Sequence, residues 1–129
     1  MKYRNEALAP ALKRLGCPTF RIMMELGNSD PANVWVLIAY PDANTYLAGQ
    51  DLSADKAYQT ASADYHDVPV DKPVFNRYTS QLLLAFTGMP EVAFPGPEAG
   101  ILELRTYEGY SEDATRRKIE MFNVEEIEL

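Results

Sequence analysis

The fold is decided by residues 19–40, which read TFRIMMEL (19–26), GNSDPAN (27–33) and VWVLIAY (34–40). A period of two in the first segment places Phe20, Ile22, Met24 and Leu26 on one face and Thr19, Arg21, Met23 and Glu25 on the other. The second segment is rich in residues typical of turns, and the third is a nearly continuous apolar run that suits a central strand. These three segments together predict a β-hairpin.

Helices are expected on both sides of this hairpin. Residues 2–15 place Leu8, Ala11, Leu12 and Leu15 on one helical face, and Gly16 is a stop signal. Pro10 lacks a backbone donor, so we expect a kink or a helix that starts late. After the hairpin, residues 42–49 suit a short helix, and Asp51 or Ser53 can cap another that continues to Tyr65.

The C-terminal part is expected to supply two further strands and one helix. The apolar run within residues 75–86 favours a strand, since Gly88 and Pro90 follow it closely. Residues 91–100 have the composition of an extended linker. Alternation over ILELRTY (101–107) predicts another strand, and Ser111 is suited to cap a final helix. The predicted order is therefore α-β-β-α-β, linker, β-α.

Composition excludes several classes of protein. The chain has 129 residues, matching one ordinary domain, and a net charge of -7, which disfavours binding to nucleic acid or to anionic membranes. With one cysteine and one histidine it contains neither an internal disulfide nor the usual four-ligand zinc site. No stretch has the length of a membrane span or the apolar core of a signal peptide. We expect a soluble protein, cytoplasmic by default, with no metal and no cofactor.

Several stretches resemble repeats of the NIPSNAP family. The sequence ELRTY (103–107), followed by a charged helix with KIEMFN (118–123), resembles the opening of such a repeat. The stretches VWVLIAYPDANTYLA, AYQTASADYHD and RYTSQLLLAFTGMP are similar to the body of the preceding repeat. The resemblance implies an α+β fold with a ferredoxin-like antiparallel sheet, helices on one face of it, and a dimeric α/β barrel.

The resemblance also implies how the chain is organised. Residues 1–90 correspond to a repeat lacking its first strand, 91–100 to a linker, and 101–129 to the first strand and helix of a second repeat. One hypothesis is that the strand 101–107 completes the sheet, in its own chain or in a partner's. The alternative is that the chain is a fragment of a longer two-repeat protein.

Candidate site residues follow from the face of the implied barrel that is opposite the helices. This interior would hold Arg21, Glu25, Gln81, Glu103, Arg105 and Tyr107. Buried charges are costly unless they are paired, so Glu103 and Arg105 would form a structural pair with their counterparts in neighbouring strands or bind a small polar ligand. We favour the structural pair, because residues two apart on a strand lie near one another. No catalytic residue is assigned.

His66 and Cys17 are the two residues whose side chains could act as a haem ligand or as a nucleophile. His66, the single histidine, is a candidate axial ligand for haem, but a position in a loop beside Asp67 favours a surface residue. Cys17 would need a base to act as a nucleophile, and its Gly-Cys-Pro context favours a small buried residue. The aromatic residues, among them Tyr58 and Tyr65, are expected to form core and interface.

Two functions remain open at this stage. The first is a NIPSNAP-like, non-enzymatic module that forms a homodimer or higher homo-oligomer through its sheet, as a half-buried antiparallel sheet requires. Eukaryotic members of the family suggest protein interaction and membrane- or vesicle-associated roles. The alternative is an enzyme like the cofactor-independent monooxygenases, with an apolar or aromatic substrate held in the lumen of the barrel. That alternative requires an enclosed cavity of at least roughly 300 Å³.

Overall fold

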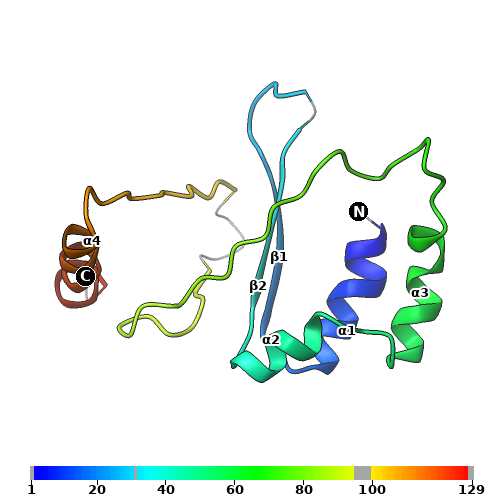
Figure 1. The fold of residues 1–129 in the computed structure, drawn as a ribbon, viewed down its shortest axis with the longest axis horizontal. Coiled ribbons are helices and arrows are strands. Elements are labelled where there is room, and N and C mark those ends of the chain that lie inside the picture. Colours follow the sequence, from blue (N-terminus) through cyan, green and yellow to red (C-terminus); the bar gives the residue numbers. More distant parts are fainter. Residues whose placement is uncertain (1, 31, 95–99, 128–129) are drawn as a thin grey trace. The chain divides into compact units, whose positions relative to one another are not determined.

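The computed structural model describes residues 2–30, 32–94 and 100–127 (Figure 1). It has a mixed α+β fold that divides into two compact units, Met1–Thr79 and Ser80–Leu129, which are described separately below. Residues 95–99 of the predicted linker lie outside the described part of the chain.

The predicted hairpin is present in the first unit. Strand β1 (Thr19–Met24) pairs with β2 (Val34–Ala39) in an antiparallel register that runs from Thr19 opposite Ala39 to Met24 opposite Val34. The amide of Glu25 donates to the carbonyl of Asn33 at 3.2 Å, which extends the ladder beyond Met24. Gly27, with a φ of 149°, begins the connecting turn in a conformation that side chains rarely adopt.

The N-terminal helix shows how the chain accommodates Pro10. A π-helical segment, η1 (Arg4–Leu8), leads directly into α1 (Ala9–Arg14), and the amide of Ala9 donates to the carbonyl of Arg4. The helix therefore does not start late, because the wider turn lies ahead of Pro10 and the proline occupies the start of α1. Gly16, with a φ of 92°, ends the helix as predicted.

Two further helices complete the first unit. Helix α2 (Ala43–Gly49) is capped by Asp42, whose carboxylate accepts from the amide of Thr45 at 2.7 Å. Helix α3 (Lys56–His66) is capped by Asp55, so the prediction of Asp51 or Ser53 as its cap is wrong. Asp51 instead accepts a hydrogen bond from the amide of Ser53 within the preceding turn.

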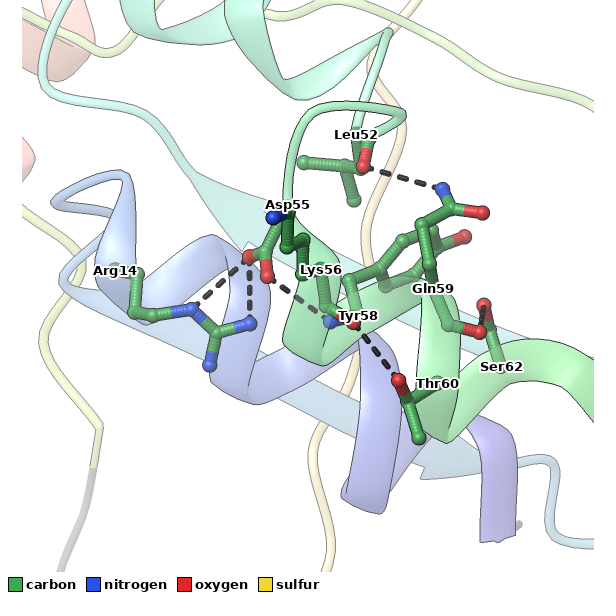
Figure 2. A network of polar contacts seen from close by, with 8 residues as sticks. All are labelled: Arg14, Leu52, Asp55, Lys56, Tyr58, Gln59, Thr60 and Ser62. Atoms are coloured by element: carbon green, nitrogen blue, oxygen red, sulfur yellow. Dashed lines mark hydrogen bonds and ion pairs between the residues drawn. The ribbon is translucent and has the colours of Figure 1, made fainter.

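Helices η1–α1 and α3 lie side by side and antiparallel (Figure 1). Lys2 pairs with Asp64 near the C-terminal end of α3, whereas Arg14 contacts Asp55 at its N-terminal end. Figure 2 shows the second contact, in which Nε of Arg14 donates to Asp55 at 2.9 Å. Five of the six buried residues of the described chain belong to these helices, and the sixth, Cys17, follows α1: Ala7, Ala11, Leu12, Cys17, Tyr58 and Ser62.

The second unit contains the predicted final helix. Helix α4 (Glu112–Met121) is capped by Ser111, as expected, and continues into a π-helical segment, η2 (Phe122–Glu126). The side-chain oxygen of Ser111 accepts from the amide of Ala114 at 3.2 Å. None of the helices in the described ranges is long and apolar enough to cross a lipid bilayer.

The two additional strands are absent from the described structure. Residues 75–86 and 101–107 form no strand, and apart from a single bridge between Phe86 and Met89 they take part in no β pairing. Within the described residues the sheet thus has two strands, β1 and β2. An apolar run or alternation favours a strand but does not supply the neighbouring edge that a strand needs for its hydrogen bonds, so neither segment is a strand in the single described chain.

Candidate functional site

The six predicted site residues are divided between the two units. Arg21 and Glu25 belong to the hairpin of the first unit, and Gln81, Glu103, Arg105 and Tyr107 belong to the second. All six are exposed. We therefore consider each group within its own unit.

Arg21 and Glu25 lie on the same face of the β1 segment, together with Met23. A guanidinium nitrogen of Arg21 donates to the carbonyl of Phe20 at 3.1 Å. Oε2 of Glu25 accepts from Ser29 Oγ and from Asn33 Nδ2, each at 2.7 Å. These two hydrogen bonds, that from Ser29 first, lower the pKa of the Glu25 carboxyl, because they stabilise its charged form.

The backbone of β1 leaves hydrogen-bonding groups exposed along one edge. In an antiparallel pair, residues that bond to the partner strand alternate with residues whose N–H and C=O point away from it. Since the amide of Glu25 donates to Asn33, the odd-numbered residues of β1 face β2. The backbone N–H and C=O groups of Phe20, Ile22 and Met24 therefore point away from β2. We call these outward-pointing groups the outer edge of β1, and no described strand pairs with them.

Both faces of the hairpin carry large apolar side chains that are only partly covered. Met24 and Val36 are 52% and 40% exposed on one face, and Trp35 is 51% exposed on the other. Leu26, which follows β1, is 73% exposed. Both faces of the hairpin therefore leave apolar surface in contact with water.

In the second unit, Glu103 and Arg105 form the pair that their spacing predicted. A guanidinium nitrogen of Arg105 donates to Glu103 Oε2 at 2.7 Å, and this contact lowers the pKa of the Glu103 carboxyl. The same hydrogen bond, with a second that Arg105 donates to the Tyr107 hydroxyl, raises the pKa of Arg105. Because both partners are exposed to solvent, the pair needs no ligand to balance its charges.

The remaining second-unit residues do not form an enclosed site. The ring of Tyr107 lies 5.3 Å from that of Phe122, and Nζ of Lys118 lies 5.0 Å from the centre of the Tyr107 ring. An open depression of about 610 Å³ lies at the start of α4, lined by residues 109–112, Thr115, Arg116 and Ile119. None of the six predicted site residues lines it.

An aromatic cluster in the first unit was missed by sequence reasoning. The rings of Tyr3 and Tyr65 stack with centres 3.7 Å apart, and Tyr3 shares a 2.9 Å hydrogen bond with the hydroxyl of Tyr58. That hydroxyl also lies 3.4 Å from Nε2 of His66, the last residue of α3 and not a loop residue. Burial and the bond to Tyr58 raise the pKa of Tyr3, so it stays protonated.

This aromatic cluster joins the two helices and is not arranged as a reactive centre. Its members come from the start of the chain and from one face of α3, where positions seven or eight residues apart lie together. That spacing was the available signal, but Tyr3 could not be assigned to the cluster without the helix pairing. Cys17 is buried, as predicted, and burial raises the pKa of its thiol.

Neither the arrangement of possible metal ligands nor comparison with known proteins identifies a reaction or a bound ion for this chain. In the part of the chain that the structure describes, no group of three or more His, Cys, Asp or Glu side chains is placed to hold a metal ion. Family models, curated proteins and solved structures contain no match to this sequence.

Proposed function

We propose that this chain is a NIPSNAP-like, non-enzymatic association module whose partner is a second copy of itself. The observation that carries the proposal is the amount of surface left exposed. The accessible surface is 10,895 Å², whereas a compact monomer of 14.5 kDa exposes roughly 6,900 Å². Compact units of the sizes of Met1–Thr79 and Ser80–Leu129, counted separately, would expose about 8,200 Å².

The surface exposed beyond that of compact units, counted over both copies of a dimer, is of the size that a large permanent interface buries. Compared with two separate compact units it is roughly 2,700 Å² per chain, or about 5,400 Å² for two copies, and the largest obligate homodimer interfaces bury about 5,000 Å² or more in total. Much of the exposed material is apolar, including Leu82, Leu83, Leu84, Ile101 and Leu104 in the second unit. The hydrophobic effect favours the removal of such surface from water.

The hairpin supports the same proposal. A two-stranded sheet is marginally stable in water, and further strands or a packed cover are needed before it is stable on its own. In the proposed assembly, residues 75–86 and 101–107 become strands of a ferredoxin-like sheet, and two such sheets form a dimeric α/β barrel. The apolar run within residues 75–86, the alternation over residues 101–107 and the open edge of β2 support this arrangement.

Solution mass and amide exchange test the proposal together. We expect light scattering to give twice the chain mass of 14.5 kDa, and we expect the amides of residues 101–107 to exchange slowly because they are hydrogen-bonded in the assembly. A chain that stays monomeric at all accessible concentrations, with fast exchange over 101–107, would contradict the proposed function.

A further inference from the structure

The outer edge of β1 limits the ways in which two copies of the hairpin can pair. In an antiparallel pair, a residue whose backbone N–H and C=O point toward the new partner must lie opposite a residue of that partner with the same orientation. Even-numbered residues of β1 therefore face even-numbered residues of the second copy. The allowed two-fold registers are centred on single residues of the segment that runs from Arg21 to Glu25.

The charges on this segment separate the registers from one another. A register centred on Arg21 places two guanidinium groups opposite each other, and one centred on Glu25 does the same with two carboxylates. Centring on Ile22 or on Met24 leaves both charges opposite uncharged residues. The register centred on Met23 is the one that places Arg21 opposite Glu25 of the second copy, and two-fold symmetry produces this pair twice.

The same register also matches the remaining side chains. Arg21 and Glu25 would occupy non-hydrogen-bonded positions, where opposed Cα atoms are about 4.5 Å apart and side chains approach most closely. On the other face, Phe20 would lie opposite Leu26, and Ile22 opposite Met24. Leu26 and Met24, at 73% and 52% exposed, would thereby lose apolar surface to water.

We propose that the outer edge of β1 binds β1 of a second copy of the chain, about a two-fold axis at Met23, with reciprocal pairs between Arg21 and Glu25. The inference rests on the proposed function and adds to it the strand, the register and the residues of self-association. The hydrogen bonds from Ser29 and Asn33 both go to Oε2 of Glu25, so neither of them uses the capacity of Oε1 to accept from the opposing arginine.

Charge reversal tests the register. Arg21→Glu and Glu25→Arg should each weaken the dimer by at least about tenfold, because two attractive pairs become repulsive. An equimolar mixture of the two variants should recover wild-type affinity as a heterodimer, since every opposed pair is again of opposite sign. Arg77→Glu makes the same change of charge at an exposed residue of the first unit and should leave the affinity unchanged. Sedimentation at a series of concentrations measures all four.

Cysteine cross-linking tests the position of the axis. In a Cys17→Ala background, Met23→Cys should form a disulfide-linked dimer under mild oxidation, because the two copies of residue 23 lie directly opposite one another. Met24→Cys is the matched control and should not be linked, since residue 24 lies opposite residue 22 of the other copy.

The outcomes distinguish this inference from the proposed function. Heterodimer rescue together with linkage through residue 23 would support the β1 edge. A stable dimer that is insensitive to Arg21→Glu and is not linked through residue 23 would overturn the β1 edge and leave the association function intact. A monomeric wild-type chain would overturn both.

Discussion

Asp55 connects two helices through one carboxylate. Its Oδ1 accepts from the amide of Tyr58 at 2.9 Å and caps α3, while its Oδ2 accepts from Arg14 at the end of α1. The bond from the Tyr58 backbone, followed by that from Arg14, lowers the pKa of this carboxyl. A capping carboxylate is effective because it satisfies amides that have no partner within the helix.

The stability of the first unit should therefore depend on pH through Asp55. The lowered native pKa means that its contribution is complete above the unfolded value of about 3.9 and is lost as pH falls through the native value. Asp55→Asn should lower the urea midpoint at neutral pH and reduce its fall in acid. Asp71→Asn, at an exposed aspartate, should change neither. Urea titrations at several pH values check this, and equal acid sensitivity in Asp55→Asn and wild type would contradict it.

Helix α4 shows how a local signal can specify an element without help from distant residues. Its charges suit its ends, with Glu112 and Asp113 in the first turn and Lys118 in the last. Asp113 pairs with Arg116 at 2.7 Å and with Arg117 at 3.1 Å, contacts between residues three and four apart. Each contact lies within the helix, so the helix was predictable.

Removal of the cap should destabilise this helix measurably. Ser111→Ala leaves the amide of Ala114 without its acceptor, and we expect a loss of about 1 kcal/mol. Ser80→Ala, at an exposed serine of the same unit, is the control and should have little effect. Chemical denaturation followed by circular dichroism measures both. If the two variants lose equal stability, the cap is not the cause.

The chain exposes more surface than a compact domain of its length. Few of its described residues are buried, and the largest fully buried apolar side chain is that of Leu12. Large exposed residues occur in both units, for example Trp35 in the first and Tyr110, at 89% exposed, in the second. Self-association would compensate for the small buried core, because it buries apolar surface that the single chain leaves exposed.

Thermal stability should consequently depend on protein concentration. A dimer that forms from folded chains draws the equilibrium away from the unfolded state, so the apparent Tm should rise over a roughly hundredfold increase in concentration. Arg21→Glu should reduce this rise, whereas Arg77→Glu should preserve it. Differential scanning at several concentrations measures the effect, and a constant Tm in the wild type would contradict association.

The sequence by itself determined the elements whose signals lie within a few residues. The hairpin followed from alternation around a turn, the end of α1 from Gly16, and the start of α4 from Ser111. Hydrogen bonds of turns and caps join near neighbours, and side-chain periodicity is a property of one segment, so these features need no knowledge of the rest of the chain.

The tertiary structure decided what depends on distant partners. Asp55 caps α3 in place of Asp51 or Ser53, and it also binds Arg14, which lies 41 positions away. Tyr3 joins Tyr58 only because two helices pack side by side. Residues 101–107 have the alternation of a strand but no neighbouring strand in the described structure. A strand needs the hydrogen-bonding edge of another strand, and the sequence of one segment does not supply that edge.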